Sequence, residues 1–148
     1  MVSGACLMIK REAFERIGRF STYCFMYVED ADLCFKARQA GWRTYYVPQA
    51  VVVHHGGGSS ARSVKTFGAV MARESLRRFF KQRRGCWYAR AFTLALAVTA
   101  AQRCLVLACA WAMQRLGGSG QGTWLSLSKW LAILRWTMGR ETWVKKYG

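Results

Sequence analysis

The stretch FMYVEDADLCFK, residues 25–36, decides how this chain is interpreted. It holds three of the seven acidic residues, Glu29, Asp30 and Asp32, in a chain whose 23 Lys and Arg give a net charge of +16. Concentrated carboxylates repel one another unless cations, a metal or catalysis make use of them. The simpler alternative is helix capping, because Asp30 could accept from free N–H groups and Asp32 would suit the helix dipole. Charge alone leaves both interpretations open.

Short helices and strands are expected around this stretch. One helix is expected over residues 10–17, with Gly18 as its stop signal, and a second from Asp32 to Ala40, ending at Gly41. Strands are expected over residues 3–9, 43–47 and 50–53, and Pro48 with Gln49 marks the turn between the last two. The pattern in residues 1–60 therefore predicts a unit that contains both helices and strands.

The character of the chain changes beyond about residue 61. Residues 64–85 predict a basic helix with five Lys or Arg between Arg77 and Arg84. Residues 91–113 are almost wholly apolar and long enough to span a bilayer, although Arg103 near their middle would cost roughly 2.5–3.5 kcal/mol there. A Gly/Ser linker over 117–122 and an amphipathic helix within 123–148 follow. The predicted divisions are thus 1–60, 61–116, 117–122 and 123–148.

The positive charge predicts an anionic partner. Basic residues alternate with apolar, tryptophan-rich segments, and no nucleic-acid-binding motif is present, so we expect an anionic membrane surface and no nucleic acid. The six cysteines form no Cys-x-x-Cys pair and are expected to be reduced. With no signal peptide at the start, we expect peripheral attachment on the cytoplasmic face of the inner or plasma membrane. A segment spanning the membrane at 91–113 is the alternative.

Residues 25–36, followed by Gly41-Trp42, resemble the "FMYxEDxDLCxR…GW" signature of family 2 glycosyltransferases. The most similar members attach rhamnose and related sugars to bacterial cell-envelope acceptors. The flanks resemble the family as well, in Gly4-Ala5, 11–14 and Ile17-Gly18 before the signature and in 46–60 after it. Two departures stand out. Ser21-Thr22 replace two acids of the family, and Lys36 replaces an arginine, which keeps the charge but loses a bidentate fork.

This resemblance implies an α/β fold, the acceptor-side, carboxy-terminal half of a GT-A Rossmann-like domain, followed by a helical tail that leans on the membrane. It also implies inverting transfer of a sugar from a nucleotide-diphosphate donor to a hydroxyl of a glycan or lipid-linked acceptor. Inversion by single displacement needs a base opposite the leaving nucleotide. By resemblance Asp30 is that base and Glu29 orients the acceptor hydroxyl, while Asp32 and Lys36 support the helix start or the acceptor.

The resemblance further implies a divalent metal, Mn²⁺ or Mg²⁺, with His54 among its ligands. A glycine-rich loop would close over the donor diphosphate through its backbone N–H groups, with Gly56, Gly57 and Ser59 as its members. Alternatives remain for each residue. Asp30-x-Asp32 could be a metal-holding Asp-x-Asp motif, His54 could bond a loop carbonyl, and the glycine-rich loop could be a linker.

The segment that binds the nucleotide in this family has no counterpart in these 148 residues. We therefore expect the chain to be inactive alone. The alternative is a non-catalytic basic membrane-associated protein that retains a decayed glycosyltransferase segment.

Overall fold

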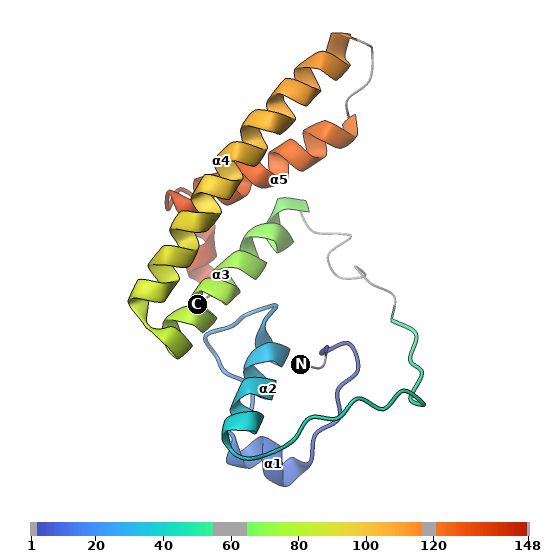
Figure 1. Ribbon diagram of the computed structural model, residues 1–148. Coiled ribbons are helices and arrows are strands. Elements are labelled where there is room, and N and C mark those ends of the chain that lie inside the picture. Colours follow the sequence, from blue (N-terminus) through green and yellow to red (C-terminus); the bar gives the residue numbers. More distant parts are fainter. Residues whose placement is uncertain (1–2, 55–64, 117–120, 148) are drawn as a thin grey trace.

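The computed structural model describes residues 3–54, 65–116 and 121–147. Five α-helices and one 3₁₀ helix form in these residues (Figure 1). They are α1 (Arg11–Arg16), α2 (Glu29–Gln39), α3 (Lys65–Arg84), α4 (Cys86–Leu116), α5 (Gln121–Thr137) and η1 (Thr142–Tyr147). The helices expected over 10–17, 32–40, 64–85 and within 123–148 are therefore present, although α2 begins at Glu29, before the expected start.

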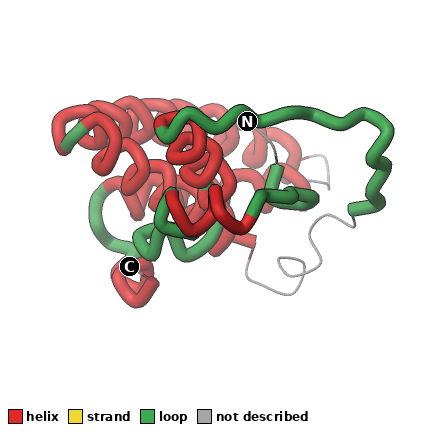
Figure 2. The backbone as a smooth tube through the Cα atoms, turned by 90° about the horizontal axis from the view of Figure 1, so that it is seen from below, coloured by secondary structure: helices red, strands yellow, loops and turns green. Residues whose placement is uncertain are grey.

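The three expected strands are absent from the described residues, which contain only helices and loops (Figure 2). Residues 43–54 instead run as a loop along one side of the helices (Figure 1). Val51 is 87% exposed and Val53 is 78% exposed, so this loop has apolar side chains without packing partners. A strand is stabilised by pairs with a neighbouring strand, and the described chain supplies no such neighbour. The expected α/β core is therefore not formed here.

Helices α3, α4 and α5 pack against one another and enclose the main apolar core. Val70 and Met71 of α3 meet Ala132 and Trp136 of α5 there, and Val144 of η1 closes one side. Gly85 separates α3 from α4 with φ of +87°, a left-handed conformation that glycine adopts at no steric cost. This tight turn folds α4 back along α3.

Helices α1 and α2 form a smaller unit that packs against α3 (Figure 1). Ala13 of α1 and Leu33 of α2 are almost fully buried. Phe35 of α2 meets Phe79 of α3 edge-on, with ring centroids 6.0 Å apart. Helix α2, which contains the acidic stretch, thus packs against α3 of the helical bundle.

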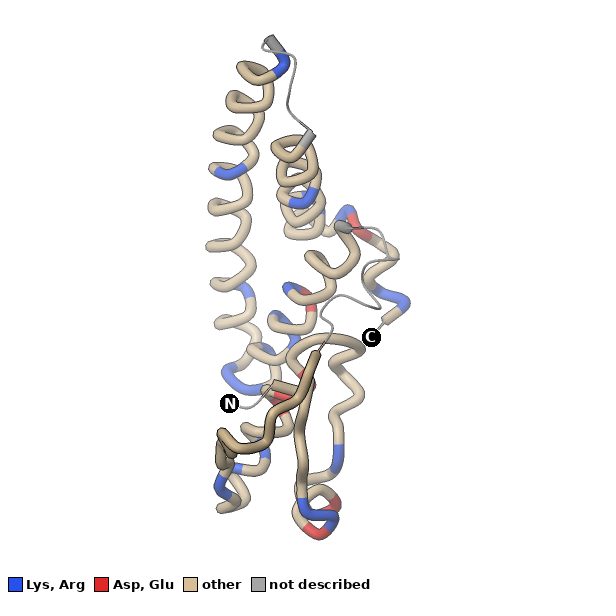
Figure 3. The backbone as a smooth tube through the Cα atoms, turned by 90° about the vertical axis from the view of Figure 1, so that its right-hand side faces the viewer, with Lys and Arg blue, Asp and Glu red and all other residues tan. Residues whose placement is uncertain are grey.

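The predicted linker over 117–122 is only partly described. Residues 117–120 lie outside the described part, and Gln121 and Gly122 already belong to α5. Helix α4 has 31 residues, and by length and apolar composition it could cross a membrane. Figure 3 shows few charged residues along it.

Candidate active site

The acidic stretch begins at a strained turn. Tyr27 has φ of 63° and Val28 has φ of 67°, two consecutive left-handed residues that are not glycine. A β-branched residue rarely adopts this conformation, and such outliers persist only where their surroundings enforce them. Val28 is the N-cap of α2, and its carbonyl accepts from the Asp32 N–H at 2.8 Å. No side chain caps this helix, so neither Asp30 nor Asp32 is the N-cap.

Helix α3 enforces the turn. The Ser75 hydroxyl donates to the Met26 carbonyl at 2.6 Å, and Arg78 Nη1 donates to the Tyr23 carbonyl at 3.3 Å. A Cβ at Gly68 would lie 2.6 Å from the Tyr27 hydroxyl oxygen, so a larger residue there would force this side chain to shift. The tyrosine also packs against the core between α3 and α5. The loop before α2 is therefore docked along α3 at three points.

Glu29 and Asp30 follow the turn as the first two residues of α2. Asp30 Oδ2 accepts from the Gly4 N–H at 2.9 Å, and Oδ1 accepts from the Ala31 N–H at 2.7 Å. Both acidic residues are partly exposed, and the enclosed Glu29 Oε2 has no hydrogen-bond partner among the described residues. No ion pair forms at Asp30 within this part of the chain. Among the described residues, its carboxylate is therefore held by backbone N–H groups alone.

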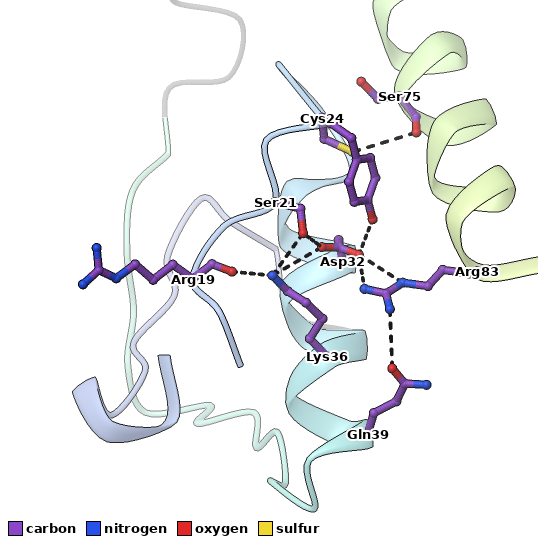
Figure 4. Close-up of polar contacts among 9 residues, drawn as sticks. Arg19, Ser21, Cys24, Asp32, Lys36, Gln39, Ser75 and Arg83 are labelled. Atoms are coloured by element: carbon purple, nitrogen blue, oxygen red, sulfur yellow. Dashed lines mark hydrogen bonds and ion pairs between the residues drawn. The ribbon is translucent and has the colours of Figure 1, made fainter. Parts of the chain in front are cut away.

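Asp32 is in a very different setting, because its side chain is 1% exposed. Arg83 of α3 donates to Oδ1 through Nη2 at 2.6 Å and Nε at 3.2 Å, and Tyr23 donates to the same oxygen. The Ser21 hydroxyl donates to Oδ2 at 2.5 Å (Figure 4). Lys36 Nζ lies 3.7 Å from Oδ2. The carboxylate is thus saturated by donors from three segments of the chain.

The pKa of the Asp32 carboxyl reflects this balance. Burial alone would raise it, but hydrogen bonds from Ser21, Tyr23 and Arg83, with the charge of Arg83, outweigh burial and lower the pKa below 3.8. The pKa of Tyr23 is raised, first by burial and then by its bond to Asp32. Asp32 is therefore ionised at neutral pH and bound to an ion-pair partner.

Lys36 lies beside Asp32 on the next turn of α2. Its ammonium donates to the Arg19 carbonyl and, at 3.0 Å, to the Ser21 hydroxyl. Ser21, one of the two departures from the family pattern, thereby bridges Lys36 and Asp32. These two charged residues join α2 to the preceding loop and to α3, and any role toward an acceptor remains a prediction.

The predicted basic stretch from Arg77 to Arg84 is largely turned inward. Glu74 is 3% exposed, and it accepts from Arg77 Nη2 and from Arg78 Nε, both at 2.6 Å. Trp136 of α5 donates to the same carboxylate at 3.1 Å. Burial would raise the pKa of Glu74, but the hydrogen bonds and charges of the two arginines lower it. Three of the five basic residues of this stretch therefore pair with buried acids, whereas Lys81 and Arg84 are exposed.

The described residues do not form the predicted metal site. Among the described residues no three His, Cys, Asp or Glu lie close enough to share a metal ion. His54 is exposed at the end of the loop formed by residues 43–54. Gly56, Gly57 and Ser59 lie outside the described residues. Asp30 and Asp32 bind different partners and do not converge, so their spacing gives no metal site here.

A cavity of about 470 Å³ opens beside the Asp32 network. Ser21, Tyr23, Gln82 and Arg83 contribute to its lining. Neither Glu29 nor Asp30 does, so this cavity is separate from the candidate base.

Arg83 is the residue of this site that the sequence analysis missed. It lies 51 positions from Asp32, and no local pattern connects the two. Glu74 could have been recognised, because arginines three and four positions later are the expected partners of a helical glutamate. The strained pair Tyr27-Val28 carries no sequence signal, since neither residue favours a left-handed conformation.

The sequence pattern of the family described as "Glycosyltransferase like family 2" matches residues 1–89. An N-acetylglucosaminyl-diphospho-decaprenol L-rhamnosyltransferase of Mycobacterium tuberculosis (strain H37Rv) is 46% identical over 61 residues, which cover 41% of this chain and 20% of that protein. The rhamnosyltransferase WbbL of Escherichia coli K12 is 36% identical over 53 residues, or 36% of this chain and 20% of that protein. No solved structure matches.

The match to these relatives thus spans about one fifth of their length. The family pattern covers more than half of the chain, from the first residue to the start of α4, and includes α1, α2, α3 and the strained turn. It therefore takes in the acidic stretch together with Arg83, which binds Asp32 from α3. The chain belongs to the family 2 glycosyltransferases.

Proposed function

We propose that this chain supplies the acceptor side of an inverting glycosyltransferase, with Asp30 as its general base. The observation that carries the proposal is the contrast between two neighbouring carboxylates. Asp32 is buried and fully engaged by Arg83, Tyr23 and Ser21. Asp30 is partly exposed at the first turn of α2, and its described partners are backbone N–H groups. Of the two, only Asp30 has a carboxylate oriented by the backbone and open to a substrate.

The chemistry follows from this position. Asp30 takes the proton of the acceptor hydroxyl while that oxygen attacks the anomeric carbon of the donor sugar. The bond to the nucleotide diphosphate breaks on the opposite face, and its electron pair leaves with the diphosphate. The start of α2 favours a negatively charged base, because the helix dipole is positive there. Glu29, beside Asp30 in the first turn of α2, would orient the acceptor hydroxyl.

The relatives suggest the substrate class. The names of both relatives describe transfer of rhamnose, and that of the M. tuberculosis protein describes transfer of L-rhamnose to a diphospho-decaprenol carrying N-acetylglucosamine. We extend this to a nucleotide-diphosphate sugar as donor and a lipid-linked or envelope glycan as acceptor. The donor-binding half would come from outside these residues. The exposed Val51 and Val53 support this idea, because strand-forming side chains without partners are suited to pairing with a sheet supplied by that half.

A divalent metal, Mn²⁺ or Mg²⁺, belongs to the proposal only in the complete enzyme. The described residues do not by themselves fit a metal site, because no three of their potential ligands lie close enough to share an ion. His54 would be one ligand, the donor-binding half would supply the others, and Gly56, Gly57 and Ser59 would approach the diphosphate. The metal would neutralise charge on the leaving diphosphate.

The test exchanges segments between this chain and its relative. The segment matching the M. tuberculosis rhamnosyltransferase is placed in that enzyme, and transfer of rhamnose to its lipid-diphosphate acceptor is measured. We expect an active chimera and no transfer by the 148-residue chain alone. A chimera that melts cooperatively at the temperature of its parent and transfers no sugar would contradict the proposal.

A further inference from the structure

One side of α4 is an exposed apolar surface. It consists of large side chains that are 53% to 80% exposed and recur close to multiples of the helical repeat, namely Trp87, Leu94, Val98, Leu105 and Met113. We call this set the α4 stripe. At 1.5 Å per residue it extends for about 39 Å, most of the length of the helix. Scattered exposed apolar residues are ordinary, but a continuous row of this length marks an interaction surface.

The opposite side of α4 is covered along its length. Phe80 of α3 meets Phe92 near the amino-terminal end, with ring centroids 5.1 Å apart. Trp124 of α5 meets Trp111 near the other end, at 5.4 Å. Ala100, between them, is fully buried. Helix α4 therefore has one packed side and one free side.

The single charge between residues 91 and 114 is Arg103, which is exposed but lies on the side of α4 that faces α5. Since each residue turns an α-helix by about 100°, Arg103 lies about 160° away from Leu105 of the stripe. Its guanidinium is 5.8 Å from the centroid of the Trp130 ring of α5. Arg103 thus points toward α5, and the stripe carries no charge.

Exposed arginines flank the stripe. Arg84 and Arg90 lie near its first residue, and Arg115 follows its last, with its guanidinium 5.5 Å from the Trp111 ring centroid. Apolar and aromatic side chains bordered by arginines fit the boundary between acyl chains and anionic headgroups. A second copy of the chain fits poorly, because two molecules with a net charge of +16 would repel.

We infer that the α4 stripe lies flat on an anionic lipid surface, with α5 on the side away from the bilayer. This binding mode is independent of glycosyl transfer, so its failure would leave the proposed reaction untouched. In this orientation Arg103 never enters the hydrocarbon, and α3, with its buried ion pairs, stays in water. A spanning α4 would instead expose both of its sides, and the helices packed on it, to lipid.

The experiment is flotation of the full chain with vesicles of phosphatidylcholine alone and of phosphatidylcholine mixed equally with phosphatidylglycerol. We expect binding to the anionic vesicles that weakens as salt rises, because salt screens surface charges. The double variant Leu94→Gln/Leu105→Gln should bind at least about tenfold more weakly, since each leucine loses the burial of its side chain in lipid. The matched control is Val51→Gln/Val53→Gln, which removes two even more exposed apolar side chains from the loop and should bind like the parent.

Several results would overturn the inference. Equal binding by the stripe variant and the control would place the docking surface elsewhere, and failure of the parent to float with anionic vesicles would exclude lipid. A dimer in sedimentation that the stripe variant abolishes would identify a second copy as the partner. Binding that ignores lipid charge and resists alkaline carbonate would indicate a spanning helix. Arg103→Leu separates the two orientations further, since it should strengthen insertion of a spanning helix and leave flat binding unchanged.

Discussion

Replacing Arg83 with Gln tests the contact that joins the acidic stretch to the helical bundle. The change removes the cation from Asp32, whose side chain is 1% exposed and cannot be solvated in place. Removing one partner of a buried ion pair typically costs about 3–5 kcal/mol. Because the Arg83 side chain keeps 20% exposure, we expect the lower end, about 3 kcal/mol. With a urea dependence of about 2 kcal/mol per molar, the unfolding midpoint should fall by about 1.5 M.

Urea unfolding followed by circular dichroism measures this loss. Arg84→Gln is the matched control, because Arg84 is the exposed neighbour and its loss should change stability by less than about 0.5 kcal/mol. Adding Asp32→Asn to Arg83→Gln should recover part of the loss, since the buried carboxylate is then neutral. If Arg83→Gln proves no more destabilising than Arg84→Gln, the buried ion pair does not hold α2 on α3.

Further predictions concern pH, packing and metal. The pKa of Asp32 is lowered in the folded protein, so its contribution to the free energy of unfolding should be complete above the ordinary carboxyl value of 3.8. That contribution should disappear as the pH falls through the folded pKa. The Asp32→Asn variant should therefore lack this part of the loss when the free energy of unfolding is measured at decreasing pH. Gly68→Ala should cost about 1–3 kcal/mol in thermal or urea unfolding, because its methyl group meets the Tyr27 hydroxyl, and Tyr27→Phe should restore most of it; a Gly68→Ala protein as stable as the parent would contradict the close approach. In the active chimera His54→Ala should raise the Mn²⁺ concentration for half-maximal rate while His55→Ala should not, and unchanged metal dependence in both would leave His54 without a metal role.

The helices could be predicted because their signals are local. Apolar spacing and the stop signals at Gly18 and Gly41 predicted their positions within a few residues. The predicted start of α2 at Asp32 was wrong. The helix begins at Glu29 because Val28 is left-handed, a conformation that α3 enforces from a distant part of the chain. The predicted strands are absent from the described residues. A strand requires a neighbouring strand to pair with, and local sequence does not show whether one is present.

The site was predictable only in part. The acidic stretch and its family could be recognised, because motif order and spacing are properties of the sequence. The separate environments of Asp30 and Asp32 could not, because the donors to Asp32 come from Tyr23, Ser21 and Arg83 on other segments. The basic stretch of α3 contributed to the charge that predicted an anionic membrane surface, but Arg77, Arg78 and Arg83 pair with buried acids. Positive charge does not reveal whether an arginine faces solvent or a buried acid.

The central claim is that Asp30 acts as the general base, whereas Asp32 is a structural residue that pairs with Arg83. Comparing two variants of the active chimera tests this claim most directly. Initial rates of sugar transfer and thermal unfolding are measured for Asp30→Asn and Asp32→Asn. Loss of a general base should lower the rate of Asp30→Asn by roughly 10²–10⁴-fold while its melting temperature stays close to that of the parent. Asp32→Asn should melt at a lower temperature and, wherever it is folded, retain more activity than Asp30→Asn. Equal rate losses, or a larger loss in folded Asp32→Asn, would contradict Asp30 as the base.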